Sequence, residues 1–252
     1  MENPNPNQKK CIIKIHEILE NPFVGFVEKI FKKKYGFEKP LCQLHEIIKE
    51  IQKEEEKNKY IHVGILGKDD RICPFIHDFH RGVDESDEFN KIYHEFVQKE
   101  IMPLVTKGNK IVIQKTPNIR FSIPEYSAIG QNPKDDYEDV VGYHKDADFG
   151  HDKDEINFIV PLTAMYDTNS IYYETNIGSN KFVNLKLDSS QMFQGYLNQL
   201  HHYNKKNGTK HMRISFDLRV MEYEKYMAKI EKFANTKFEL GKYYVVLESV
   251  SL

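Results

Sequence analysis

The segment from Arg213 to Val220, R-I-S-F-D-L-R-V, alternates strictly between polar and apolar residues. Successive side chains of an extended strand point to opposite faces, so the pattern predicts a β-strand with two unlike faces. The apolar face carries Ile214, Phe216, Leu218 and Val220, and must be covered by other parts of the chain. The polar face carries Arg213, Ser215, Asp217 and Arg219. It is either solvated or turned into a barrel, where its charges would need partners because unpaired buried charge is very costly.

Two further stretches supply metal-ligating side chains: His144-Lys145-Asp146 and the later pair His201-His202. Residues i and i+2 of a strand project to one face, so His144 and Asp146 can offer an imidazole nitrogen and a carboxylate oxygen to one ion. A second imidazole from a distant strand would complete a set of two histidines and one carboxylate. That set, with the opposite positions open, is the facial triad of non-haem Fe(II) oxygenases.

The net charge of such a site predicts a role for Arg213. Fe(II) with one carboxylate keeps one positive charge, and a bound 2-oxo dicarboxylate turns this into one negative charge. A single guanidinium restores neutrality, and its planar fork matches a carboxylate through two hydrogen bonds. Ser215 shares the face of Arg213 and can add a hydroxyl donor.

The stretch from Gln114 to Val220 resembles the 2-oxoglutarate and Fe(II)-dependent oxygenases of the streptomycin-biosynthesis type, distant relatives of phytanoyl-CoA hydroxylase. The matching pieces follow the order of that family. They are Q-K-T-P-N-I-R-F-S-I-P (114–124), Y-H-K-D-A-D-F-G-H (143–151), N-F-I-V-P-L-T (157–163), T-N-S-I-Y-Y-E-T (168–175), H-Y-N-K-K-N-G-T (202–209) and R-I-S-F-D-L-R-V (213–220).

The resemblance implies an α+β fold with a mainly β core, a double-stranded β-helix of the jelly-roll or cupin-like kind. It also implies iron ligation by His144, Asp146 and a later histidine, with Arg213 and Ser215 on the 2-oxoglutarate carboxylate. Further residues of the matching pieces are expected near the co-substrate (Gln114 and Asn157) or the substrate (Arg120, His151, Asn169, Glu174 and Arg219). For several of these a structural hydrogen bond is the alternative, and Arg219 could instead pair with Asp217.

The third ligand is a choice between two neighbours. Adjacent residues of a strand point to opposite faces, so His201 and His202 cannot both reach one ion. The family pattern H-G-N-x-x-N before the arginine fits residues 202–207, and we therefore take His202 as the ligand. Tyr203 stands where the family has glycine, which keeps His201 as the alternative.

The function that the resemblance implies is hydroxylation of a small metabolite by a 2-oxoglutarate-dependent dioxygenase. Fe(II), 2-oxoglutarate and O2 would be required, succinate and CO2 would be released, and an Fe(IV)-oxo species would abstract the substrate hydrogen. Because Asp146 is retained, halogenation is not expected, whereas desaturation or ring closure stays open. Two other classes are a cupin-like metal enzyme that does not use 2-oxoglutarate and a non-catalytic jelly-roll module that binds a small molecule.

Composition limits the possible partners. The chain has 252 residues, 40% of them hydrophobic, and a net charge of −2, so a general nucleic-acid or membrane surface is not expected. Three scattered cysteines indicate no disulfide framework, and we expect a reducing cytoplasm. The sequence leaves the oligomeric state open.

One elaborated domain is the simplest division of the chain, with a mainly helical part (1–105), a β core (106–221) and a C-terminal helix and strand (222–252). Apolar residues recur at helical spacing in 23–31, 41–51 and 87–101, and we place these helices against the larger sheet. Strands are expected at 110–116, 119–124, 156–162, 171–175, 181–187, 211–220 and 242–248. A helix is expected near 222–233.

The loop that leads into the first histidine is acidic. Residues 134–155 hold nine acids and three bases. An acidic rim at the mouth of a site would favour a cationic substrate such as an amine. A solvated loop that contacts no ligand is the alternative.

Overall fold

The computed structural model describes residues 13–47, 75, 79, 82–83, 87–124 and 143–249. The N-terminal part begins with a short strand and continues mainly as helix. Its elements are β1 (Lys14–Glu17), α1 (Pro22–Tyr35), the 3-10 turn η1 (Leu41–Gln43), α4 (Glu88–Phe96), the π-helical η3 (Val97–Ile101) and α5 (Met102–Val105).

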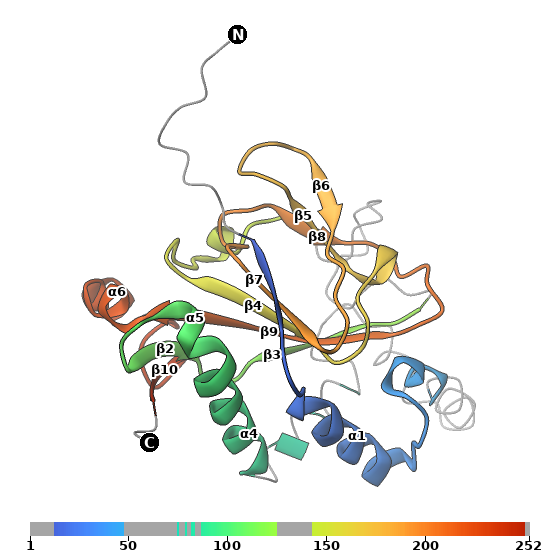
Figure 1. Ribbon diagram of the computed structural model, residues 1–252. Helices are drawn as coiled ribbons and strands as arrows, with labels where there is room; N and C mark the ends of the chain where they lie inside the picture. The colour runs from blue at the N-terminus through green and yellow to red at the C-terminus, as the bar shows by residue number, and fades with distance from the viewer. Residues whose placement is uncertain are drawn as a thin grey trace.

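The core consists of two antiparallel sheets, with the smaller one above the larger in Figure 1. The larger sheet has the order β1, β7 (Gln191–Gly195), β4 (Ile156–Pro161), β9 (Arg213–Glu222), β2 (Lys110–Gln114) and β10 (Tyr244–Glu248), and β3 (Asn118–Ser122) also pairs with β9. The smaller sheet has the order β6 (Phe182–Asn184), β5 (Ile171–Glu174) and β8 (His202–Asn204). This arrangement confirms the predicted double-stranded β-helix.

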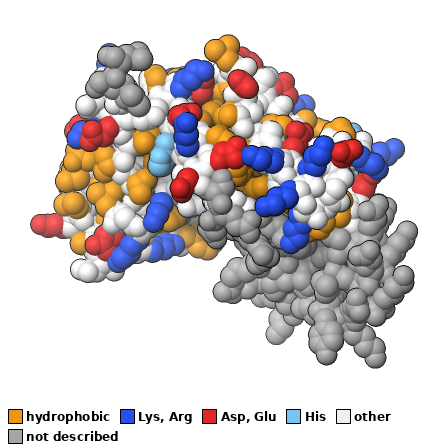
Figure 2. Space-filling model, turned by 90° about the horizontal axis from the view of Figure 1, so that it is seen from below, with side chains coloured by type: hydrophobic (Ala, Val, Ile, Leu, Met, Phe, Trp, Pro, Cys, Tyr) orange, Lys and Arg blue, Asp and Glu red, His pale blue; other side chains and the backbone are white. Residues whose placement is uncertain are grey.

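The helices cover the outer face of the larger sheet, as predicted. Phe216 on β9 is 1% exposed, and its ring centroid lies 5.1 Å from that of Phe23, 5.4 Å from Phe79 and 5.8 Å from Phe89. Figure 2 views the molecule from the helix side and shows acidic and basic side chains interspersed over the described surface. The helices therefore bury an apolar stripe against the sheet and turn a mixed-charge face to water.

Helix α1 has local signals at both ends. The Asn21 side chain accepts a hydrogen bond from the Phe23 amide at 3.3 Å, and Pro22 occupies the first turn, where its missing N–H leaves no helical bond unmade. Gly36 ends the helix with φ of +64°, a left-handed conformation that glycine adopts without steric cost. These signals set where the apolar stripe of α1 meets the sheet.

The space between the sheets is divided into an apolar and a polar end. The apolar end is a cluster of buried residues: Ile159, Met165, Leu185, Leu187, Phe193 and Leu197. At the polar end, Arg213, Ser215 and Arg219 of β9 are 2%, 1% and 7% exposed. The polar face of β9 is thus turned into the barrel rather than solvated, and its charges need partners there.

Several elements differ from expectation. Strands β1 and β7 were not predicted, because each is short and neither alternates clearly between polar and apolar residues. The strand that was expected to carry the later histidine, without stated bounds, is β8. The C-terminal helix is two short ones, α6 (Tyr223–Met227) and α7 (Ile230–Phe233). In the helix expected at 41–51, only η1 and the turn up to Ile47 are described, and residues 48–51 lie outside the described residues. None of the described helices has both the length and the apolar character needed to cross a bilayer.

Candidate metal centre

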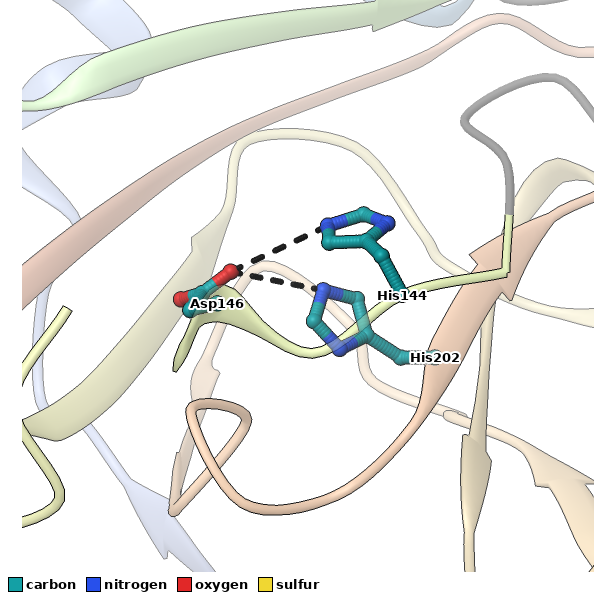
Figure 3. Close-up of side chains that lie close together, drawn as sticks. All are labelled: His144, Asp146 and His202. Atoms are coloured by element: carbon teal, nitrogen blue, oxygen red, sulfur yellow. Dashed lines mark ion pairs between the residues drawn. The ribbon is translucent and has the colours of Figure 1, made fainter. Parts of the chain in front are cut away.

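Three predicted ligands lie together between the sheets (Figure 3). Asp146 Oδ1 is 3.9 Å from His144 Nε2 and 3.6 Å from His202 Nε2, and the three potential donor atoms lie within 4.8 Å of one another. His144 and His202 face each other through a β-bridge, with N–O distances of 3.2 and 2.9 Å. Two segments 58 residues apart in the chain are thereby held in register (202 − 144 = 58).

The strand geometry expected for residues 144–146 holds only in part. His144 and Lys145 are extended, but Asp146 is the first residue of the 3-10 turn η4 (Asp146–Phe149). The Asp146 amide donates to the Leu197 carbonyl at 3.2 Å, and the Asp148 carboxylate accepts from the Lys145 amide at 2.9 Å. The turn therefore starts at Asp146 itself, and these hydrogen bonds fix the backbone position from which its side chain extends.

The His202 side chain is held in its neutral form. Its Nδ1 lies 3.1 Å from the Leu200 carbonyl oxygen, which can only accept, so Nδ1 carries the hydrogen and Nε2 presents its lone pair to Asp146 and His144. Burial lowers the pKa of His202 to about 4, although Asp146 acts in the opposite direction. At neutral pH the imidazole is therefore ready to bind a cation.

Asp146 uses its two oxygens differently. Oδ2 accepts hydrogen bonds from Asn157 Nδ2 at 2.7 Å and from Arg219 Nη2 and Nε at 2.8 and 3.1 Å, while Oδ1 faces the histidines. Burial opposes ionisation of this carboxyl, but Arg219, His202 and Asn157 hold its pKa down at about 2. The ligand is ionised throughout the physiological range.

Arg213 is a buried cation with few partners. Within the described part of the chain, Nε and Nη1 have no hydrogen-bond partner, and Nη2 has only a 3.4 Å contact with Asn204 Oδ1. Burial and the nearby Arg120 guanidinium lower its pKa to about 10, which still leaves it charged at neutral pH. Asn204 and His202 are two residues apart on one strand and share a face, so the guanidinium lies on the same side of the smaller sheet as the metal ligands.

The residues fit the implied iron and 2-oxoglutarate. Two imidazoles and one carboxylate form the donor set of non-haem Fe(II) enzymes. The unpaired buried guanidinium of Arg213 calls for an anion, and one carboxylate of a dicarboxylate whose other end binds the metal would supply it. Ser215 is buried on the same face of β9 and can donate its hydroxyl to that carboxylate.

Two of the other predicted residues, Gln114 and Arg120, lie on the polar side of the barrel. Gln114 Oε1 accepts from Tyr243 Oη at 3.0 Å and lies 3.4 Å from Arg219 Nη1. Arg120 Nε donates to Asp217 Oδ1 at 2.9 Å. This contact keeps Asp217 ionised: burial raises the pKa of its carboxyl, but Arg120 and Arg219 outweigh burial and lower that pKa well below its usual value. The predicted contacts of Gln114 with co-substrate and of Arg120 with substrate stay predictions.

Three other predicted substrate residues make local contacts. Asn169 Oδ1 accepts from the Tyr166 amide at 2.8 Å, which closes a turn. The fully buried Glu174 accepts from the Asn180 amide at 2.8 Å and lies 3.3 Å from His201 Nδ1. His151 Nδ1 lies 2.7 Å from Glu155. These contacts account for their burial, and contact with substrate stays a prediction for all three.

In the described half of the acidic loop, Asp152 and Asp154 are neutralised by lysines within the protein. Asp152 pairs with Lys229 and Lys232 at 2.5 Å, and Lys229 also pairs with Asp154. The acids at 135, 136, 138 and 139 lie outside the described residues. Among the described acids of this loop only Asp148 is exposed, where it accepts the Lys145 amide at 2.9 Å, so a single described acid is left to support an acidic rim.

The sequence did not identify every residue around the site. Asn204 beside Arg213 could have been found, since it shares the face of His202 by strand alternation. The Leu200 carbonyl and the exposed ring of Phe149, whose centroid lies 5.1 Å from that of His144, carried no signal. Backbone acceptors and turn residues have no characteristic spacing.

No protein family profile matches the chain. The chain is 25% identical over 211 residues to the streptomycin biosynthesis protein StrG of Streptomyces griseus, which covers 80% of this chain and 91% of that protein. This distant homology confirms the resemblance drawn from the sequence pieces.

Solved structures give weaker similarities. The nickel complex of the non-haem monooxygenase ThoJ has a TM-score of 0.41 and 16% identity and covers 54% of each chain. The α-ketoglutarate-dependent epimerase SnoN from nogalamycin biosynthesis has a TM-score of 0.40 and 9% identity over 85% of this chain and 79% of its own. A prolyl hydroxylase from Trichoplax adhaerens has a TM-score of 0.37 and 12% identity over 86% of each chain.

Proposed function

We propose that the protein is a 2-oxoglutarate-dependent non-haem iron dioxygenase that hydroxylates a small metabolite. One observation carries the proposal. The protein combines a His-Asp-His cluster with a buried guanidinium, that of Arg213, whose Nε and Nη1 have no hydrogen-bond partner among the described residues. In the overall reaction one oxygen atom of O2 enters a substrate C–H bond, the other enters succinate, and 2-oxoglutarate loses CO2. The bound iron supplies the activation of dioxygen.

The residues of the chain hold the reactants. His144, His202 and Asp146 would bind the metal through Nε2, Nε2 and Oδ1. Arg213 and Ser215 would hold the far carboxylate of 2-oxoglutarate, so that its keto-acid end meets the metal. Positioning the co-substrate in this way converts an encounter in solution into a reaction within one complex.

The charge of the loaded site supports the same assignment. Fe(II), Asp146, 2-oxoglutarate and Arg213 sum to zero, and Arg219 and Asp217, 2.8 Å apart, cancel each other. Arg120, which also pairs with Asp217 and is 40% exposed, adds one positive charge, which favours a dianionic co-substrate. A cupin-like enzyme without 2-oxoglutarate gives Arg213 no partner and would remain active in Arg213→Glu. A binding module without iron would retain its ligand in Asp146→Ala.

Anaerobic addition of Fe(II) and 2-oxoglutarate tests the proposal. We expect the visible charge-transfer band of the chelate in the parent protein and its loss in Asp146→Ala. Absence of the band from the parent at saturating concentrations contradicts the proposal. Screening metabolites for stimulated succinate release then identifies the substrate. A product with one added oxygen supports hydroxylation, whereas a product without it contradicts hydroxylation but not the oxygenase class.

A further inference from the structure

Asp146 is surrounded by hydrogen-bond donors on one side only. Oδ2 receives three N–H groups, one from Asn157 and two from Arg219, at 2.7 to 3.1 Å. A carboxylate oxygen has two lone pairs, so three donors leave Oδ2 no good acceptor direction for a metal. Oδ1 is the oxygen that faces both histidines.

The two donor residues are held by the larger sheet. Arg219 on β9 and Asn157 on β4 are directly paired in register, and both side chains point into the barrel. Arg219 is fixed on its other edge, where Nη1 donates to Asp217 Oδ2 at 2.8 Å and lies 3.4 Å from Gln114 Oε1. The guanidinium is therefore held by neighbours on two strands and cannot swing away from Asp146 without breaking an ion pair.

We propose that Arg219 and Asn157 are positioning residues that restrict Asp146 to one-oxygen coordination through Oδ1. This inference rests on the proposed function and concerns how the same site stays open. A facial triad works because the opposite positions are free, with two for the chelating co-substrate and one for dioxygen. A second oxygen from Asp146 would take one of these positions. By engaging Oδ2, the pair keeps that position for the reactants.

Restricting Asp146 to one oxygen can be distinguished by experiment from simple support of the fold. Loss of structural support would weaken metal and co-substrate binding together and lower the melting temperature in proportion. Loss of the restriction on Oδ2 would allow Asp146 to chelate the metal, so metal binding would be largely kept while co-substrate binding fell. Outer contacts to metal ligands typically change affinity or activity about 10- to 100-fold, which gives the expected scale.

The test compares Arg219→Gln and Asn157→Leu with the control Arg120→Gln. Arg120 also pairs with Asp217 and lies near Arg213, so this control removes a neighbouring guanidinium while both donor residues of Asp146 Oδ2 stay in place. Two quantities are measured: the Co(II) d–d spectrum of the metal-substituted protein, which changes when a carboxylate oxygen replaces a bound water, and the dissociation constants of Fe(II) and 2-oxoglutarate under anaerobic conditions. Asn157→Leu removes no charge and serves if Arg219→Gln does not fold.

We expect Arg219→Gln and Asn157→Leu to change the Co(II) d–d spectrum and to raise the 2-oxoglutarate dissociation constant about tenfold or more, with a smaller change for Fe(II). Arg120→Gln should match the Co(II) spectrum of the parent. Unchanged spectra and 2-oxoglutarate affinity in the variants, or parallel losses of metal and co-substrate, overturn the inference alone. A parent protein that binds neither Fe(II) nor Co(II) overturns the proposed function as well.

Discussion

His201 and His202 are neighbours in the chain, but their imidazoles lie on opposite faces of the smaller sheet. The His202 ring faces Asp146, with Nε2 3.6 Å from Oδ1. The His201 ring stacks on Tyr143 with a centroid distance of 4.3 Å, and its Nδ1 lies 3.3 Å from Glu174. Strand alternation therefore brings only His202 to the candidate metal site.

Substitution at these two positions should have opposite outcomes. In His202→Ala we expect the Fe(II) dissociation constant to rise by at least about 100-fold, beyond what loss of an outer contact causes. His201→Gln keeps a polar neighbour for Glu174 and should bind Fe(II) like the parent. Anaerobic metal titration measures both. A larger loss in His201→Gln than in His202→Ala would contradict the assignment.

We expect the Arg213 side chain to lower the free energy of unfolding of the metal-free protein. Replacing a buried, unpaired charge with a well-packed apolar side chain is often stabilising, and we expect Arg213→Met to raise the free energy of unfolding by about 1–3 kcal/mol. Charged hydrogen bonds contribute about 1.5–3 kcal/mol, so the 2-oxoglutarate dissociation constant should rise at least about tenfold.

Urea unfolding and anaerobic 2-oxoglutarate titration measure these two effects. Arg120→Met is the matched control, because it removes a guanidinium that is already paired with Asp217 and should give no gain in stability. A destabilised Arg213→Met that still binds 2-oxoglutarate normally would contradict the predicted role of Arg213.

Phe216 connects the larger sheet to the helices. Its ring packs against Phe23, Phe79 and Phe89, so Phe216→Ala would leave a cavity among aromatic rings. We expect the free energy of unfolding to fall by about 3–5 kcal/mol in urea titrations. Leu19, which is 91% exposed, is the control, and Leu19→Ala should change stability by less than about 0.5 kcal/mol. Equal effects at the two positions would contradict the packing described.

Asp152 should make stability depend on pH. Burial raises the pKa of its carboxyl, but Lys229 and Lys232 outweigh this and hold it at about 2, below the unfolded value of about 3.9. Because the folded pKa is lowered, this stabilisation of about 1–2 kcal/mol is complete above about pH 5 and is lost as the pH falls towards 2.

The variant Asp152→Asn isolates this contribution. The difference in free energy of unfolding between parent and variant should be constant from about pH 5 to 7 and should shrink between about pH 4 and 2. Chemical denaturation at a series of pH values measures the difference. A difference that stays flat to pH 2, or that grows on acidification, would contradict the role of the lysine pairs.

Part of the fold was predictable because its signals are local. The alternation of Arg213 to Val220 predicted which side chains of β9 face the helices, and helical spacing in residues 23–31 predicted the stripe of α1 that covers them. Strands β1 and β7 escaped prediction because they have four and five residues and are stabilised mainly by partners that lie far away in the chain.

The sequence by itself determined the donor types, their order and the face that Arg213, Ser215 and Arg219 share on β9, since a strand's side chains alternate whatever surrounds it. Only the tertiary structure decided which charge meets which. Arg219 reaches Asp146 across 73 residues, whereas Arg213, on the same face of the same strand, has no strong partner in the part of the chain that the structure describes. The difference arises from the register of β9 against β4 and from the turn that begins at Asp146, and neither is encoded in the spacing of residues along β9.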